Sequence, residues 1–452
     1  MLFGLLSFVT FTFIGAAVDM GRWLQARRVT MDAMESATLA GLRAYQESNS
    51  DAAVAEAQAL LNYRANTMGR PPVSTDTVSF KLENSGSTIA MKALGNAEYQ
   101  TLFLAVMPTI MNVKSLPMLR TDNSEHPVSK LAVGQNSGTN LEVAMMLDIT
   151  GSMGSYDNSG KKKIDSLKEA AKKLIDIVIW DDQSQYTSKV SLVPFSEAVN
   201  LGSARANAAR GPKPADISAK DASGSTRTWK ASNDCVTERI GTYKYTDVSL
   251  STAPSSAHRS RDGSCATKSI LRPLDNDKSM LKKAIDAFVE SGFTAGQIGT
   301  EWAWYTLSPN MNSLWGNSKN NARPYSDVTA KNAKGRPVLN KIAVLMTDGE
   351  YNMQYCSTNI PDKNSGPSNS SKGNCTAANA TSQSQALSVC SAMKDKGITV
   401  YTVGFMVGTS EKTLLTSCAT SPEHFYDASD GAQLLAAFTD IAYKLVPPYV
   451  AH

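Results

Sequence analysis

Residues 143–154 read VAMMLDITGSMG, an apolar run that ends in an acidic residue, two hydroxyl residues at alternate positions and a glycine. An apolar run of this length, bounded by turn-forming residues, is typical of a buried parallel strand. Asp148, Thr150 and Ser152 then leave the carboxyl end of the strand together, where open α/β sheets bind ligands. Carboxylate and hydroxyl oxygens are hard donors, so this segment favours Mg²⁺, Mn²⁺ or Ca²⁺ over zinc.

Two later segments carry side chains of the same kind. Gly292, Phe293 and Thr294 follow an amphipathic segment and place a threonine in a loop. Residues 341–350 read KIAVLMTDGE, a second apolar strand, which ends at Asp348. Because the carboxyl ends of parallel strands meet at one edge of a sheet, these oxygens are expected to converge with those of the first segment.

This combination resembles the metal-ion-dependent adhesion site of von Willebrand factor A domains. The resemblance implies that Thr150, Ser152 and Thr294 contact a divalent cation directly or through water. It also implies that Asp148 and Asp348 are the acidic members and that the cation is Mg²⁺ first, with Ca²⁺ and Mn²⁺ left open. The usual first hydroxyl is serine, so Thr150 departs from the pattern but keeps the donor. In the alternative interpretation the hydroxyls cap a helix N-terminus and the aspartates only end their strands.

The segment from residue 140 to 446 alternates strand and helix patterns, which predicts an α/β domain with a doubly wound, Rossmann-like parallel sheet. Residues 162–179 place apolar side chains three and four apart, as in a helix with one buried face. Trp302 and Trp304 are predicted to be packing anchors of a helix. Residues 201–277 are too long for an ordinary connection and are predicted to be an insertion pinned by a disulfide.

Other chemistries fit the sequence less well. Two carboxylates on adjacent strand ends could act as an acid–base pair, but the hydroxyls around them fit a hydrated cation better, so the protein is not expected to be an enzyme. The net charge of +4 is too small to indicate nucleic-acid binding. The lysines at 161–163, with those at 168, 172 and 173, are predicted to form the solvated face of a helix.

The six cysteines predict disulfides. They are spread over the second half of the chain with no C-x-x-C pair, a pattern that fits an oxidising compartment better than a zinc site. Sequence alone does not fix which cysteines pair. Neighbours in sequence suggest Cys235–Cys265, Cys356–Cys375 and Cys390–Cys418; the alternative is six buried free thiols.

The N-terminal segment, residues 1–22, is predicted to be a transmembrane anchor, because residues 2–18 are free of charge. A cleaved signal peptide is less consistent with the sequence, since no basic residue precedes Leu2. Arg22, Arg27 and Arg28 would favour a cytoplasmic body under the positive-inside rule. The cysteines favour the opposite side, and the expected orientation follows the cysteines. This orientation leads us to expect that a basic N-terminal extension is missing from the start of the sequence.

Residues 23–121 predict a pilin-like region of helix followed by a small sheet. A hairpin is expected around a turn at Asn84, Ser85 and Gly86. Residues 122–139 are polar, with a proline and two glycines, and are predicted to be a linker.

Several segments together resemble the TadG-like proteins of Tad (Flp-type) pilus assembly, which carry a von Willebrand factor A domain. They are AVDMGR at 17–22, ARR at 26–28, ER at 238–239, GFT at 292–294, WAW at 302–304, MTDG at 346–349 and YTVGF at 401–405. The resemblance implies a single-pass protein of the bacterial inner membrane with its body in the periplasm or at the cell surface. It also implies a protein partner, from the pilus or the envelope, that supplies an acidic residue to the metal. The alternative is a purely structural envelope or pseudopilin-like component with a vestigial metal site.

Overall fold

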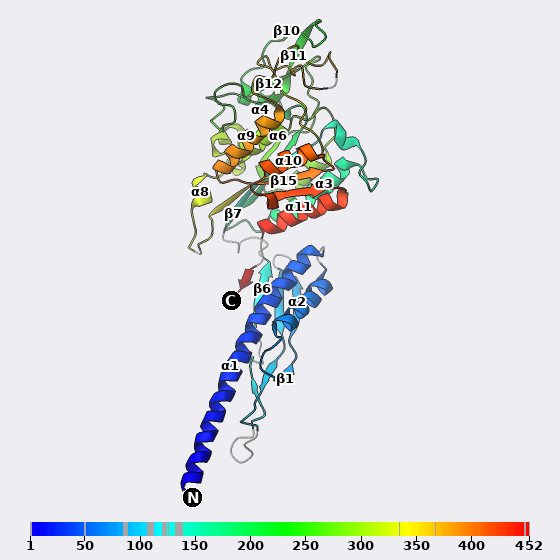
Figure 1. Cartoon of the computed structure of the whole chain (residues 1–452). Coiled ribbons are helices and arrows are strands. Elements are labelled where there is room, and N and C mark those ends of the chain that lie inside the picture. The colour runs from blue at the N-terminus through cyan, green and yellow to red at the C-terminus, as the bar shows by residue number, and fades with distance from the viewer. Residues whose placement is uncertain are drawn as a thin grey trace. The chain divides into compact units, whose positions relative to one another are not determined.

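The chain folds as two units (Figure 1). The first contains Met1–Asn136 with Val446–His452, and the second Ser137–Leu445. This computed structural model describes residues 2–48, 51–84, 89–105, 113–119, 124, 126–131, 139–333, 335–366, 368–446 and 449–451. The side chains at 2–9, 11, 46, 47, 84, 130, 131 and 449–451 also lie outside the description.

In the first unit, α1 (Leu2–Glu47) packs against α2 (Ala52–Asn66) through small side chains. Ala33 and Ala59 are buried, and both belong to the same apolar cluster. A Cβ added at Gly41 would lie 2.9 Å from the Cβ of Ala59, so only glycine permits this approach of the two helices. The face of α1 that carries Ala33 and Gly41 is therefore its packing face.

The predicted boundary at residue 22 is not a structural boundary, because α1 continues through it. Asp19, inside the predicted anchor, is fully buried and accepts hydrogen bonds from the backbone N–H groups of Leu102, Phe103 and Leu104 at 2.8–2.9 Å. Within the described part of the chain, no helix combines the length and apolar character needed to cross a membrane. The side chains of residues 1–9 and 11, most of the apolar part of the predicted anchor, lie outside the described residues.

Two small antiparallel sheets complete the first unit. The hairpin prediction is confirmed, since Ser79 pairs with Leu94 and Asn84 with Ile89; the turn between the strands lies outside the described residues. The linker prediction is wrong for residues 128–131, which form a strand paired on both sides. Its polar Ser129 is buried and satisfied by a 2.7 Å hydrogen bond with the hydroxyl of Thr38. The strand orders are β1 (Val73–Asp76), β4 (Ala97–Gln100), β5 (Ser115–Pro117), and β17 (Tyr449–Ala451), β6 (Val128–Leu131), β3 (Ile89–Leu94), β2 (Ser79–Asn84).

The second unit is built on a central sheet, which confirms the prediction of a mixed α/β fold. Its middle is parallel throughout, in the order β8 (Ser188–Phe195), β7 (Asn140–Asp148), β14 (Leu339–Thr347), β15 (Thr399–Phe405), β16 (Phe425–Ala428). β7 and β14 are neighbours in register, Leu147 opposite Met346, so both strands end at the same edge. That edge receives Asp148 and Asp348.

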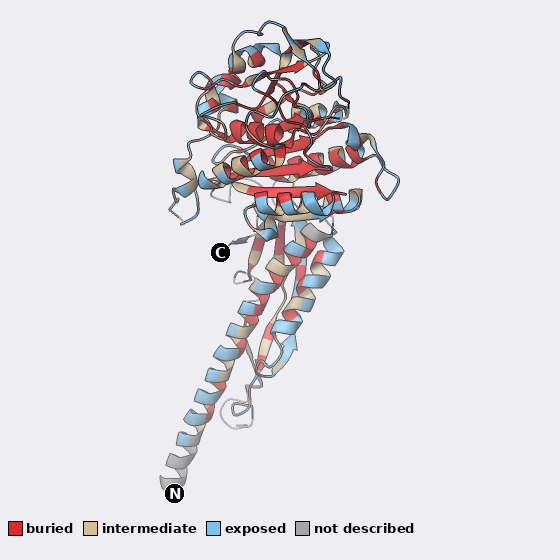
Figure 2. Ribbon diagram, turned by 45° about the horizontal axis from the view of Figure 1, so that its top comes forward, coloured by how far each residue is buried: buried red, intermediate tan, exposed pale blue. Residues whose placement is uncertain are grey.

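Helices cover both faces of this sheet, so β7 is buried along its length (Figure 2). Its side chains alternate: Val143 and Leu147 enter one apolar cluster, and Met146 enters the other. The first cluster is completed by α3 (Lys163–Val178), α5 (Lys278–Asp286) and α11 (Gly431–Leu445). The second is completed by α4 (Ser203–Arg210), α6 (Gly296–Leu307), α7 (Asn312–Trp315), α9 (Ser382–Asp395) and α10 (Thr409–Cys418), whereas α8 (Ser326–Thr329) has no fully buried residue.

α6 lies close against the sheet. A Cβ at Gly299 would lie 2.7 Å from the Phe195 ring, and one at Gly296 would lie 2.0 Å from the Tyr351 ring. Trp302 and Trp304 are buried, as predicted for packing anchors. The start of α6 is thereby fixed beside the segment that follows Asp348.

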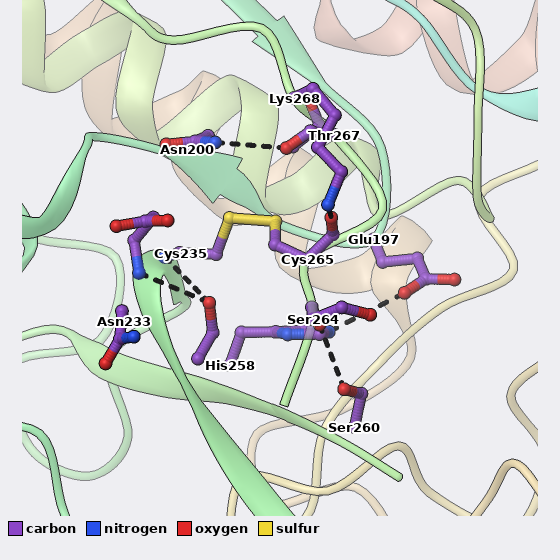
Figure 3. Close-up of a disulfide and its surroundings, with 12 residues drawn as sticks. Glu197, Asn200, Asn233, Cys235, His258, Ser260, Ser264, Cys265, Thr267 and Lys268 are labelled. Carbon is purple, nitrogen blue, oxygen red and sulfur yellow. Dashed lines mark hydrogen bonds and ion pairs between the residues drawn. A yellow bond between two sulfur atoms is a disulfide. The ribbon is translucent and has the colours of Figure 1, made fainter. Parts of the chain in front are cut away.

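The predicted insertion at 201–277 is ordered and widens the sheet. It contributes β10 (Ile217–Lys220), β11 (Thr226–Thr237), β12 (Ser256–Ser260) and β13 (Arg272–Asp275), joined in part through β9 (Val199–Asn200). Figure 3 shows the Cys235–Cys265 disulfide that pins it and the contact of His258 with Glu197, in which Nε2 lies 3.6 Å from Oε2. The insertion is therefore anchored to the loop after β8.

All three cysteine pairs suggested by sequence neighbours are confirmed as disulfides. Each closes a short segment, with partners separated by 30, 19 and 28 residues. Such links stabilise mainly by restricting the unfolded chain.

Thiol titration of the denatured, unreduced protein is therefore expected to detect no free cysteine, because no cysteine is left unpaired. The same sample after reduction is the control and should titrate as fully reduced. Free thiols in the unreduced protein would contradict the assigned pairs.

Candidate metal site

Asp148 is held by donors on both of its carboxylate oxygens. It is fully buried at the end of β7. Oδ1 accepts from the backbone N–H and the hydroxyl of Thr150, at 2.9 and 2.6 Å. Oδ2 accepts from the hydroxyl of Thr347 at 2.6 Å. These bonds fix the carboxylate in one orientation.

Ser152 links this group to the second strand. Its hydroxyl oxygen lies 2.9 Å from that of Thr150 and donates to Oδ1 of Asp348 at 2.6 Å. A continuous series of oxygen atoms therefore runs from Asp148 through Thr150 and Ser152 to Asp348. The structure brings together four of the five predicted site residues across two strand ends.

Thr294 is tied to the same place through its backbone. The backbone N–H of Gly151 donates to the carbonyl of Gly292 at 2.9 Å, so the loop before Thr294 lies against the loop after β7. Thr294 and Asn352 exchange two bonds, from the Thr294 N–H to Asn352 Oδ1 at 3.0 Å and from the Asn352 N–H to the Thr294 carbonyl at 2.9 Å. Within the described residues, the Thr294 side chain itself makes no hydrogen bond to the other four.

The capping alternative does not account for these hydroxyls. Thr150 precedes a short 3-10 turn, and α3 and α6 follow Lys162 and Ala295, yet in all three cases no side chain caps the helix. The Thr150 and Ser152 hydroxyls are engaged with carboxylates instead. Thr294 is not the residue that precedes α6.

Lys163 does not lie on a solvated helix face, so that prediction is wrong for this residue. Lys163 is buried, and its Nζ lies 3.0 Å from Oδ2 of Asp348. As the first residue of α3 it precedes Leu167 by four and Ala170 by seven, which puts it on the buried face of the helix. That spacing was visible in the sequence. Thr347 and Asn352 were also missed, although both lie within four residues of Asp348.

The Asp348 carboxylate adds to the cost of ionising Asp148. Burial and then the nearby Asp348 carboxylate raise the pKa of Asp148 from 3.8 to about 7. A divalent cation would remove this penalty, and the oxygen donors are of the type it prefers. Within the described residues, no three His, Cys, Asp or Glu side chains converge as a metal site, so a cation here would depend on hydroxyl and water oxygens as well. The donor set therefore fits a hydrated hard cation.

The N-terminal segment matches a protein family. Residues 1–56 match the family Tad, described as "Putative Flp pilus-assembly TadE/G-like". The predicted resemblance to Tad-type proteins is confirmed on this segment. A comparison with curated proteins gives no match.

Solved structures of other proteins resemble the chain at low sequence identity. The von Willebrand factor domain of the type V pili tip protein Mfa5 from Porphyromonas gingivalis is 13% identical, with 68% of this chain and 95% of that chain covered and a TM-score of 0.36. The adhesive tip pilin GBS104 from Group B Streptococcus agalactiae is 14% identical, with 65% and 98% covered and a TM-score of 0.36. The pilus adhesin SpaC from Lactobacillus rhamnosus GG is 12% identical, with a TM-score of 0.37; 84% of this chain is covered but only 37% of the SpaC chain.

Proposed function

We propose that this protein is a membrane-anchored envelope component of Tad (Flp-type) pilus assembly that binds a protein partner through a divalent cation. The cation would be held by Asp148, Thr150, Ser152, Thr294 and Asp348, with Mg²⁺ the first candidate. The observation that carries the proposal is the series of hydrogen-bonded oxygens that joins Asp148 to Asp348. The match of residues 1–56 to a pilus-assembly family supports the pilus part.

The residues of such a site would have different roles. Thr150 and Thr347 orient Asp148, so its carboxylate needs no rearrangement to contribute to the cation site. The Ser152 hydroxyl now donates to Asp348, and it can rotate to offer its lone pair instead. When bound, a divalent cation supplies an electrophilic position for a carboxylate oxygen of the partner. This is binding without turnover, so we propose no enzymatic activity.

Capture of envelope proteins by the full chain, with and without a chelator, tests the function. We expect a partner that is lost with the chelator and restored by Mg²⁺. In the competing function, a structural component with a vestigial site, capture is independent of the chelator. That outcome would remove the metal from the proposal.

Thr294→Val tests the least connected member of the site. Loss of the hydroxyl is expected to weaken Mg²⁺ binding about tenfold, the effect of losing roughly one ligand interaction of 1.4 kcal/mol. The free energy of unfolding of the cation-free protein should fall by no more than about 1 kcal/mol, because the backbone bonds to Asn352 remain. Ser291→Ala, in the same loop, is the control and should leave both quantities unchanged. Unaltered Mg²⁺ affinity in Thr294→Val would remove Thr294 from the site.

We further propose that the body lies outside the cytoplasm, with the part of the predicted anchor that precedes Asp19 in the inner membrane, because Asp19 is bonded to the folded unit. The three disulfides support this side, since such bonds persist in oxidising compartments. A carboxyl-terminal fusion to a reporter that works only in an oxidising compartment is expected to be active. Activity of a cytosol-only reporter at the same position would reverse the orientation.

A further inference from the structure

Among the lysines at 161–163, 168, 172 and 173, Lys163 is the one whose ammonium group contacts a residue of the candidate metal site. Its side chain is 11% exposed, and the Asp348 side chain that it contacts is fully buried. The ammonium also lies over the Phe405 ring, 5.9 Å from its centre. A buried ammonium group carries a desolvation penalty unless a counter-charge offsets it. Here the counter-charge is the Asp348 carboxylate.

The two oxygens of Asp348 have separate partners. Oδ1 accepts from Ser152, which belongs to the series of site oxygens, whereas Oδ2 accepts from Lys163. The lysine therefore does not stand among the site oxygens. It holds the carboxylate from its second oxygen and leaves Oδ1 directed toward Ser152.

We propose that Lys163 sets the net charge of the cation site and thereby makes the site selective for a protein partner that supplies one carboxylate. The inference rests on the proposed cation site and adds the residue that selects the partner. Lys163 acts through Asp348, so it is a positioning residue and not a metal ligand.

The net charge of the site depends on Lys163. Asp148 and Asp348 carry two negative charges when ionised, and Lys163 leaves a single one. A divalent cation then gives the site a net charge of plus one, which one carboxylate of a partner neutralises. Without the lysine, the cation and the two carboxylates would already be neutral, and a partner carboxylate would bring an uncompensated charge into a buried place. Lys163 therefore weakens the binding of the cation but strengthens the binding of the partner's carboxylate.

The neighbouring Lys162 provides a matched comparison. It carries the same charge one residue away, but its side chain is 43% exposed and lies 3.6 Å from the Glu290 carboxylate. Solvent screens an exposed charge of this kind. Lys162→Met therefore removes one positive charge without removing the contact to Asp348.

The test measures two affinities of the full chain at pH 8, with Mn²⁺ as the cation and acetate as the carboxylate. In Lys163→Met and Lys163→Gln we expect Mn²⁺ to bind about tenfold more tightly and acetate to bind the Mn²⁺-loaded protein about tenfold more weakly. Lys163→Arg, which keeps the charge, and Lys162→Met should both match the parent. A lysine that only stabilises the fold would not move the two affinities in opposite directions.

Each outcome decides the question. If the parent binds Mn²⁺ and the neutral variants keep both affinities, the inference on Lys163 fails while the cation site stands. If the parent binds no Mn²⁺, both fail together. If both neutral variants are unfolded while Lys163→Arg is folded, the lysine serves the fold and the inference is overturned.

Discussion

Asp148→Asn is expected to weaken divalent-cation binding strongly and, at the same time, to stabilise the cation-free protein above pH 7. The amide keeps the shape of the side chain but carries no charge to attract a cation. Affinity for Mg²⁺ should fall by a factor of about one hundred or more, the equivalent of roughly 3 kcal/mol. Asp148 is fully buried and is one of only two carboxylates among the five predicted site residues. No other predicted site residue can therefore replace its negative charge.

The stability gain follows from the direction of the pKa shift. Burial and the neighbouring Asp348 raise the pKa of Asp148 to about 7 in the folded protein, from 3.8. Between these two values the folded state holds a proton that the unfolded state has lost, so stability falls as pH rises through this window. Above pH 7 the whole penalty is present, at about 1.4 kcal/mol for each unit of pKa shift. Asparagine does not titrate and avoids it.

Denaturant unfolding at pH 5 and pH 8 in the presence of a chelator measures this difference. The variant should gain stability relative to the parent between the two pH values, and the comparison cancels the titration of other groups. Asp165→Asn, an exposed aspartate in the first turn of α3, serves as control and should show no such gain. A variant that keeps its Mg²⁺ affinity would refute the site.

The two strand-end aspartates could be predicted from the sequence because strong local patterns determine them. The apolar runs before Asp148 and Asp348 are long enough to specify buried parallel strands, and parallel strands end at one edge. Ser152 follows at a fixed spacing, so its position was fixed with that of Asp148. The cation that this arrangement would hold remains a prediction.

The burial of Lys163 could have been predicted from the sequence, because its spacing to Leu167 and Ala170 puts it on the buried face of the helix. The other features that were not predicted depend on tertiary contacts. Asn352 holds Thr294 through a loop whose path no periodic pattern describes. Residues 128–131 looked like a linker because the strand is short and polar, and its partners, β3 and β17, lie far away in sequence.

A buried ion pair joins the two strands that carry the site. Glu142 of β7 stands opposite Lys341 of β14, six residues before Asp148. Their side chains are 1% and 0% exposed, and Nζ lies 2.5 Å from Oε2. Lys341 also donates to the Leu307 carbonyl at 2.8 Å, and Glu142 Oε1 accepts from the Arg323 N–H at 2.9 Å. The pair therefore connects both strands to their surroundings.

Lys341→Met is expected to lower the free energy of unfolding by about 3–5 kcal/mol, since it leaves the Glu142 carboxylate buried without its counter-charge. Glu142→Leu should cost a similar amount, because it leaves the ammonium unpaired. Denaturant unfolding of the parent and both variants measures these values. As a control, Lys282→Met breaks the exposed pair with Asp176 and should cost less than about 1 kcal/mol.

The double variant Glu142→Leu with Lys341→Met separates the ion pair from simple packing. With both charges gone no charge is left unpaired, so the double variant should be more stable than the sum of the single losses predicts. It should not reach the parent, because the Leu307 carbonyl and the Arg323 N–H lose their partners. If the pair also sets the register, the single variants should weaken Mg²⁺ binding even while folded, since a shift between β7 and β14 separates Asp148 from Asp348. Additive losses with full Mg²⁺ affinity would show that packing alone aligns the strands.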